Sequence, residues 1–373
     1  MIVSGKIKQE ISERGPIPFS RYMEMCLYDP EAGYYSRNAE QFGKAGDFYT
    51  SSDVHAVYGR LLARQFDEMW RALDRPTEIA VLELGPGRGL FAQDVLDWSA
   101  KKFPEFSECL RYVMVESSPA LRRRLEERFA SQMAANKVEI FESTPSMQEN
   151  TIVFANEYFD ALPVEIISSE GQLYVDFKHD RFTDIFLPAQ PECLEYLDRY
   201  SVHPESGERV EACLAASSAM DQICSAIRRG FLTVVDYGYT RSEQFEGRHR
   251  GTLMTYRQHS ASPDPYEAPG EQDITAHVNF TALADVAEKH GLQVEPLLTQ
   301  SQFLVGIGET TQFADAFEDC RMPQERAKVA LQLKHLVTPS GMGETFHVLV
   351  CCKNVERSRV ADLAGLGFIK SRI

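Results

Sequence analysis

The sequence lacks the long apolar runs that a membrane-spanning helix requires. No apolar run approaches the ~20 residues that cross a bilayer. The start of the chain also lacks the features of a signal or transit peptide, because Glu10 and Glu13 come early and arginine is scarce there. We therefore expect a cytoplasmic bacterial protein with no membrane span.

Paired cysteine motifs and an excess of basic residues are absent as well. The eight cysteines are scattered without Cys-x-x-Cys spacing, so we expect reduced thiols and no metal site. Asp and Glu total 55 against 39 Lys and Arg, a formal charge of −16, which disfavours a nucleic-acid partner. A hydrophobic content of 43% is normal for a folded globular protein.

One glycine-rich stretch joins a predicted strand to a predicted helix. It reads Ala80-Val81-Leu82-Glu83-Leu84-Gly85-Pro86-Gly87-Arg88-Gly89-Leu90-Phe91. A strand that turns into a helix through residues without side chains lets a ligand approach the backbone closely. The dinucleotide fingerprint requires a further glycine where Leu90 stands, which disfavours an NAD site.

The next predicted strand, residues 112–116, ends in a second acidic residue, Glu116. The pattern Glu-x-Gly-x-Gly-x-Gly resembles the first motif of Rossmann-like methyltransferases that use S-adenosylmethionine. This resemblance implies that Gly85, Gly87 and Gly89 lie near the amino-acid part of the cofactor and that Glu116 binds the two ribose hydroxyls. We assign Glu83 to the same pocket. The alternative is an ordinary glycine turn and a surface carboxylate.

Strands and helices alternate from Ala80 onward, which predicts an α/β fold. We expect a Rossmann-like class I methyltransferase core, doubly wound and mostly parallel, with an antiparallel last strand. The expected parts are a helical N-terminal region (1–75), the first part of the core (76–164), an inserted substrate-side subdomain (165–229), and the rest of the core (230–373) with an active-face loop (248–280) and C-terminal helices. Within the insertion we predict a hairpin around Glu170-Gly171 and a helix over 207–229.

Acidic and amide side chains follow the fourth predicted strand of the core, residues 151–155. Because ligands bind beyond the carboxyl ends of parallel strands, Asn156, Glu157 and Asp160 are expected at the site. We assign Asn156 to the cofactor and the two carboxylates to catalysis, since residues three apart can face one group if a helical turn begins there. Asp160 could instead cap a helix, and Asn156 could close a turn.

Three further candidates come later in the chain. Asp236 and Tyr237 end the fifth predicted strand, and we assign both to the substrate, although Asp236 could equally be a plain strand-end turn former. His277 could orient the substrate or accept a proton, since the ordinary pKa of a histidine is ~6.5. A structural hydrogen bond is the alternative role for this histidine.

Several motifs together carry a more specific resemblance. They are Gly46-Asp47-Phe48-Tyr49-Thr50-Ser51, the glycine motif, Asn156-Glu157-Tyr158-Phe159-Asp160-Ala161-Leu162-Pro163-Val164, Asp236-Tyr237-Gly238, Asp273-Ile274-Thr275-Ala276-His277-Val278-Asn279-Phe280 and Met342-Gly343-Glu344-Thr345-Phe346. Nearly the whole chain resembles the MidA family, which comprises the mitochondrial complex I assembly methyltransferase and its bacterial relatives. The resemblance further implies that Asp47 and Thr50 close over the methionine end of the cofactor.

The resemblance implies an S-adenosylmethionine-dependent protein arginine methyltransferase. Its mitochondrial members symmetrically dimethylate an arginine of a respiratory complex I subunit. Carboxylates such as Glu157 and Asp160 can hold a guanidinium bidentately, which fits that acceptor. We expect a protein substrate that bears an arginine and allow for a homodimer. A small-molecule methyltransferase and a non-catalytic, cofactor-binding assembly factor stay open as alternatives.

Overall fold

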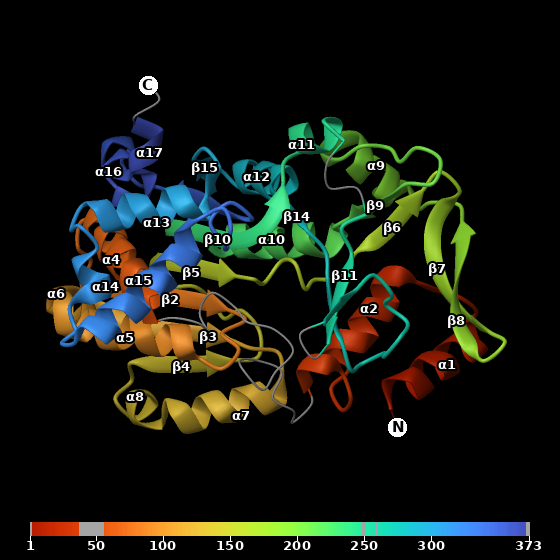
Figure 1. Ribbon diagram of the computed structural model, residues 1–373, viewed down its shortest axis with the longest axis horizontal. Helices are drawn as coiled ribbons and strands as arrows, with labels where there is room; N and C mark the ends of the chain where they lie inside the picture. Colours follow the sequence, from red (N-terminus) through yellow and green to blue (C-terminus); the bar gives the residue numbers. More distant parts are fainter. Residues whose placement is uncertain (1, 37–55, 248–250, 258–259, 371–373) are drawn as a thin grey trace.

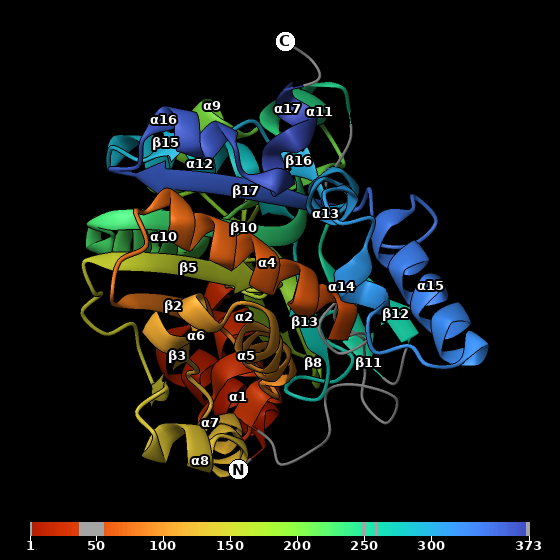
Figure 2. The same cartoon turned by 90° about the vertical axis from the view of Figure 1, so that its left-hand side faces the viewer.

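The computed structural model describes residues 2–36, 56–247, 251–257 and 260–370. Within these ranges the main sheet has the strand order β15-β17-β10-β5-β2-β3-β4, with β14 beside β10 and β16 beside β17 (Figure 1; β16 and β17 are labelled in Figure 2). Its strands are β2 (Ile79–Leu84), β3 (Leu110–Val115), β4 (Val138–Phe141), β5 (Asn150–Asn156), β10 (Arg229–Tyr239), β14 (Val278–Asn279), β15 (Gln293–Val294), β16 (Leu298–Thr299) and β17 (Phe346–Lys353).

The direction of these strands confirms the predicted fold class. β2, β3, β4, β5 and β10 run parallel, and β17 pairs antiparallel with β10. β2 lies between β3 and β5, so the chain first runs outward to β4 and then returns to the other side of β2. In an open parallel sheet such a reversal of strand order creates a crevice at the carboxyl ends of the two central strands.

Two hydrophobic cores cover the two faces of this sheet because successive strand side chains alternate between them. Val81 and Phe154 face one core, whereas Leu82 and Ala155 face the other. The first core is closed by α4 (Ala56–Ala72), α5 (Leu90–Lys102) and α13 (Gln300–Glu309), and the second by α10 (Leu214–Ala226) and α12 (Phe280–Lys289). Figure 2 shows α4 and α5 crossing in front of the stacked strands.

A second sheet links the N-terminal region to the insertion. Its strands are β1 (Ile17–Pro18), β6 (Glu165–Ser168), β7 (Gly171–Lys178), β8 (Arg181–Leu187) and β9 (Arg209–Ala212). β1 pairs antiparallel with β7, and α1 (Val3–Arg14) and α2 (Phe19–Tyr28) lie beside this sheet, far from α5 (Figure 1). The predicted hairpin around Glu170-Gly171 is confirmed, because β6 and β7 pair antiparallel on either side of it. The two-residue β1 joins the predominantly helical N-terminal region to this hairpin.

The predicted helix over 207–229 is wrong at its start, over residues 207–213. The structure has β9 there, which pairs with β6, and α10 begins only at Leu214. Val210, Glu211 and Ala212 are all buried, so burial does not alternate along this strand, and four residues are too few to reveal a strand period in sequence. An additional helix, α9 (Pro191–Tyr200), was not expected; it has Pro191 in its first turn, where the missing N–H has no cost.

Part of the predicted active-face loop forms a small third sheet. β11 (Met254–Arg257) lies between β12 (Ser260–Ser262) and β13 (Asp273–Thr275), and both pairings are antiparallel. The remaining helices are α6 (Pro104–Cys109), α7 (Pro119–Arg128), α8 (Ala130–Ala134), α11 (Arg241–Phe245), α14 (Ala314–Phe317), α15 (Pro323–Val337), α16 (Arg357–Ala361), α17 (Gly367–Lys370) and the 3-10 helices η1 (Tyr34–Ser36) and η2 (Ala364–Leu366). None of the helices in the described ranges is long and apolar enough to cross a membrane.

We predict a large loss of stability when a buried aromatic side chain of β5 is truncated. Phe154 is fully buried and stacks on Phe91 of α5 with a centroid separation of 4.6 Å. We expect Phe154→Ala to lower the free energy of unfolding by about 3–5 kcal/mol, measured by chemical denaturation. Leu331→Ala on α15 is the control, because Leu331 is 68% exposed and its truncation should cost less than about 0.5 kcal/mol. Similar losses in the two variants would contradict this assignment of the core.

Candidate active site

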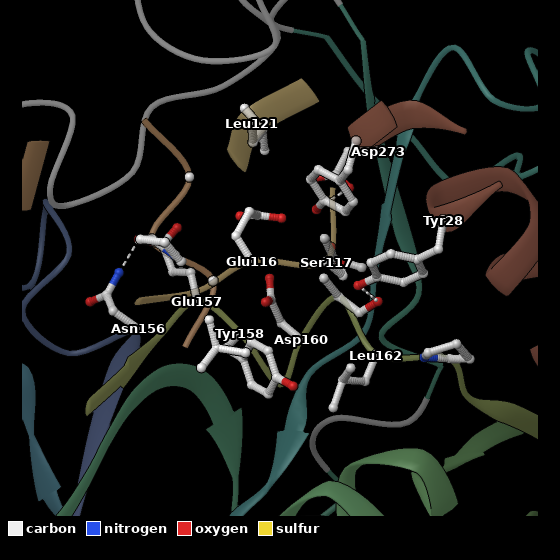
Figure 3. A pocket seen from close by; sticks show the side chains of 18 of the residues that line it. Tyr28, Glu116, Ser117, Leu121, Asn156, Glu157, Tyr158, Asp160, Leu162 and Asp273 are labelled. Carbon is white, nitrogen blue, oxygen red and sulfur yellow. Dashed lines mark hydrogen bonds between the residues drawn. The ribbon is translucent and has the colours of Figure 1, made fainter. Parts of the chain in front are cut away.

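A cavity of about 710 Å³ lies at the carboxyl ends of the parallel strands. Its lining includes Gly85 and Gly87 after β2, Glu116 after β3, Asn156 at the end of β5, Tyr237 in β10 and Phe346 at the start of β17. Figure 3 shows Glu116, Glu157 and Asp160 around the same space. The volume falls in the range of small-molecule and cofactor pockets. The ends of five neighbouring strands, β3, β2, β5, β10 and β17, therefore all contribute residues to the lining of the cavity.

The three motif glycines adopt backbone conformations that other residues rarely take. Gly85, Gly87 and Gly89 have φ angles of 63°, 52° and 72°. A Cβ atom on Gly89 would lie 2.6 Å from Cδ2 of Leu125 and 2.7 Å from Cε2 of Phe129, so this glycine permits close packing of α7 against the start of α5. Gly85 and Gly87 line the cavity, where a ligand can reach their backbone.

Glu116 is a buried carboxylate at the end of β3. Its side chain is 6% exposed and accepts the N–H of Ser118 at 2.8 Å. Burial raises the pKa of Glu116 to about 7, although the backbone N–H groups of Ser118 and Gly87 favour its charged form. A buried carboxylate held beside the glycine turn can accept hydrogen bonds from two neighbouring hydroxyls, which fits the predicted ribose contact.

Glu83 lies elsewhere, although it belongs to the same motif. Its carboxylate accepts the hydroxyl of Tyr112 on β3 at 2.8 Å, and burial raises its pKa to about 8. It is not among the described residues that line the cavity. The structure therefore gives Glu83 a contact between strands, and its predicted contact with the cofactor stays a prediction.

The turn after β5 brings Asn156, Glu157 and Asp160 into the cavity lining. Asn156 accepts the hydroxyl of Tyr58 at 2.7 Å and donates to Oε1 of Glu157 at 3.1 Å. Glu157 has a φ angle of 50°, unusual for a residue with a side chain, and its N–H donates to the carbonyl of Val235 at 2.9 Å. Backbone strain of this kind is concentrated at functional sites.

Asp160 carries an unsatisfied oxygen. Its side chain is 5% exposed, Oδ2 accepts the hydroxyl of Tyr237, and Oδ1 has no hydrogen-bond partner among the described residues. Burial raises the pKa of Asp160 to about 6, while the hydrogen bond from Tyr237 and, to a smaller extent, the backbone N–H groups of Ala161 and Asp160 oppose that shift. Leaving a buried carboxylate oxygen without a donor is costly, so a ligand that donates to Oδ1 would be stabilised there.

Asp236 is fully buried behind this turn and is not among the described lining residues. Its Oδ2 accepts the N–H groups of Tyr158, Phe159 and Asp160 at 3.2, 3.0 and 3.3 Å, and Oδ1 accepts that of Tyr237 at 3.0 Å. Burial, together with the charges of Asp160 and Glu157, raises the pKa of Asp236 well above its ordinary range. The structure thus places Asp236 as a support of the turn.

Tyr237 and His277 share one wall of the cavity. Their rings meet edge to face with centroids 5.4 Å apart, and Tyr237 makes a similar contact with Phe346 at 5.4 Å. The backbone N–H of His277 donates to Oγ1 of Thr252 at 3.0 Å. The wall therefore combines aromatic faces with the carboxyl group of Asp160.

Sequence reasoning missed several lining residues from distant segments. Tyr28 donates to the carbonyl of Ala161 at 3.0 Å, and Tyr35 donates to Oδ1 of Asp273 at 2.8 Å (Figure 3 shows Tyr28 and Asp273). The aromatic run near residue 28 and the motif that contains Asp273 were the signals in the sequence. The predicted cofactor residues Asp47 and Thr50 lie outside the described residues.

Comparison with known proteins decides the family. A family model described as "Putative S-adenosyl-L-methionine-dependent methyltransferase" matches residues 61–297, more than half of the chain. The chain belongs to the MidA family of S-adenosylmethionine-dependent methyltransferases. It is 26% identical to the protein arginine methyltransferase NDUFAF7 homolog of Drosophila melanogaster, over 97% of this chain and 87% of that protein. It is also 26% identical to human NDUFAF7, over 91% of this chain and 80% of that protein.

A solved relative supports the cofactor. The chain matches a protein from Burkholderia thailandensis bound to S-adenosyl-homocysteine, with a TM-score of 0.83 and 29% identity over 97% of this chain and 94% of that one. The glycine turn and the buried Glu116 carboxylate of this MidA-family chain fit such a ligand, and S-adenosylmethionine is its cofactor. In the part of the chain that the structure describes, no group of three or more His, Cys, Asp or Glu side chains could hold a metal ion.

The raised pKa of Glu116 predicts pH-dependent cofactor binding. Two ribose hydroxyls need the ionised carboxylate, whereas the free protein begins to protonate Glu116 as the pH falls through about 7. S-adenosyl-homocysteine affinity should therefore weaken by up to about tenfold per pH unit below that value, with release of a proton on binding. Calorimetric titration between pH 5.5 and 8.5 measures both effects.

Glu116→Gln should weaken binding at pH 8 by about 10- to 100-fold and flatten its pH dependence. The matched control is Glu139→Gln, because Glu139 is exposed on β4 and should leave both quantities unchanged. An unaltered affinity in Glu116→Gln would rule out the ribose contact.

Proposed function

We propose that the chain is a protein arginine methyltransferase that methylates guanidinium nitrogens of a protein substrate, with symmetric dimethylarginine as its product. The names of the relatives support the acceptor class, although they stand at 26% identity. Symmetric dimethylation rests on the family resemblance alone. The observation that carries the proposal is Oδ1 of Asp160, which has no hydrogen-bond partner among the described residues and belongs to a residue that lines the cavity with Glu157.

The order of the strands separates two halves of the cavity. Of the lining residues assigned to the cofactor, Gly85, Gly87 and Glu116 follow β2 and β3, on one side of the turn after β5, and Asn156 ends β5 itself. Tyr237 and Phe346 come from β10 and β17 on the other side, together with His277. A methyl group is transferred in line, so the acceptor must approach from the side opposite the cofactor's sulfur. The half beside Tyr237 is therefore the proposed acceptor half.

The charges around the cavity favour a cationic acceptor. Six carboxylates belong to its lining, namely Glu24, Glu116, Glu142, Glu157, Asp160 and Asp273. Arg88 is the one Lys or Arg side chain among the described lining residues. Carboxylates bind guanidinium with strong, directional hydrogen bonds, and the aromatic faces of Tyr237, His277 and Phe346 can stack on a planar cation.

The chain's own side chains supply alignment and a proton acceptor. When bound, S-adenosylmethionine supplies a methyl group on a positively charged sulfur, and its loss leaves neutral S-adenosyl-homocysteine. Glu157 and Asp160 hold the guanidinium and localise its positive charge away from the attacking nitrogen. That nitrogen loses one proton for each methyl group it gains, and Oδ1 of Asp160 is placed to take it, with a pKa raised to about 6.

Replacing Glu157 should separate transfer from cofactor binding. We expect Glu157→Gln to keep its affinity for S-adenosyl-homocysteine within about threefold and to lose methyl transfer by at least ~100-fold, because the amide cannot pair with a guanidinium. The assay uses methyl-labelled S-adenosylmethionine and protein extract from a strain that lacks the gene. Acid hydrolysis and amino-acid analysis then identify the methylated residue and the symmetry of the product.

Wild-type transfer should also fall with pH below about 6, as Asp160 takes up a proton. Glu170→Gln, on the exposed hairpin turn, is the matched control and should behave as wild type. Label on small molecules alone, or no label despite cofactor binding, would refute the arginine acceptor and favour a metabolite methyltransferase or an assembly factor.

A further inference from the structure

We infer that Tyr237 is a positioning residue: its hydroxyl holds Oδ2 of Asp160, so that Oδ1 is the oxygen left to meet the acceptor. This inference rests on the proposed function and refines it, since it gives the Tyr237 hydroxyl a role through Asp160 that is separate from the stacking surface of its ring. The hydrogen bond from the Tyr237 hydroxyl to Oδ2 and the absence of a described partner for Oδ1 carry the inference.

The hydroxyl of Tyr237 has a single hydrogen to donate, and it donates that hydrogen to Oδ2 of Asp160. Because Oδ2 is engaged in this way, Oδ1 is the oxygen of this carboxyl group that has no partner among the described residues.

The ring of Tyr237 is itself fixed in place. It packs edge to face against His277 on one side and Phe346 on the other, with both centroid separations at 5.4 Å. In the sheet, Tyr237 also pairs with Phe346 across β10 and β17. Because the ring is held by separate segments of the chain, the removal of the hydroxyl alone should leave its packing intact.

The same end of β10 also fixes the backbone that carries Asp160. Asp236 accepts the N–H groups of residues 158–160, as described above, while its neighbour Tyr237 binds the Asp160 side chain. Two adjacent residues thus set the main chain and the carboxyl rotation of the turn. Oδ1 of Asp160 is therefore oriented before any substrate binds, which reduces the free-energy cost of ordering the site on binding.

The titration of Asp160 depends on a small set of neighbours. Asp236 and Tyr237 lie on β10, Glu157 lies on the same turn, Tyr28 and Tyr35 come from the N-terminal region, and Tyr256 comes from β11. Among these groups, Tyr237 is the one whose side-chain hydrogen bond favours the ionised form of Asp160. Loss of its hydroxyl should therefore raise the pKa of Asp160.

A direct titration tests the inference without any acceptor. The carboxyl carbons of aspartate are labelled with ¹³C in the full chain, and the Asp160 resonance is assigned by its loss in Asp160→Asn. We expect Tyr237→Phe to raise the Asp160 midpoint by about one pH unit. Tyr256→Phe removes a hydroxyl from the same cavity that does not hydrogen-bond to Asp160 and should leave the midpoint in place. An unchanged midpoint in Tyr237→Phe, in a variant with wild-type thermal stability, would overturn the inference.

The pH profile of transfer gives the functional counterpart. In Tyr237→Phe the acid limb of kcat/KM for arginine methylation should move to higher pH by the same amount, and S-adenosyl-homocysteine affinity should be unchanged. Absence of arginine methylation in the wild type would refute the proposed function, whereas the NMR midpoint would still decide the role of Tyr237. Methylation with an unshifted acid limb in Tyr237→Phe would refute the positioning role alone.

Discussion

The candidate site depends on one buried carboxyl group, that of Asp236, which accepts hydrogen bonds from the backbone N–H groups of the turn after β5. Asp236 lies out of reach of water, and a buried carboxyl group is tolerated only where hydrogen-bond donors replace its hydration. Three consecutive N–H groups from residues 158–160 and one from Tyr237 converge on it. This arrangement holds Glu157 in its strained conformation and turns Asp160 toward the cavity. The parallel pairing of β5 with β10 brings the turn after β5 next to Asp236, so the geometry of the site depends directly on the pairing of the sheet.

Much of the fold and part of the site could be predicted because their signals are local. The apolar runs of β2, β3, β5 and β10 are buried on both faces, and the glycine spacing defines the turn that follows β2. Glu116, Asn156, Glu157 and Asp160 each follow such a run closely. Since parallel strands end at the same edge, their position along the chain was enough to place all four around one cavity.

The rest depended on distances in space that no local pattern encodes. Glu83 and Asp236 were themselves predicted at the site, Glu83 for the cofactor and Asp236 for the substrate. In the structure the carboxyl group of Glu83 accepts the hydroxyl of Tyr112, and that of Asp236 accepts the backbone N–H groups of the turn. The contact between Tyr35 and Asp273 joins residues 238 positions apart. β9 and the two-residue strands β15 and β16 are too short for a period to show, and Pro296 between the latter two removes a ladder donor. The four-part division of the chain stays a prediction.

The antiparallel strand β17 (Phe346–Lys353) lies near the end of the sequence and is therefore among the last parts of the sheet to be synthesised. It enters the sheet between β10 and β15, and its first residue, Phe346, lines the same cavity as Tyr28 from the N-terminal region. A growing polypeptide makes the glycine turn early, but the pocket stays unfinished until nearly the whole chain has left the ribosome. Contacts over such separations also slow folding. The proposed acceptor half is therefore completed last, whereas the strands that carry the proposed cofactor residues, β2, β3 and β5, lie in the first half of the chain.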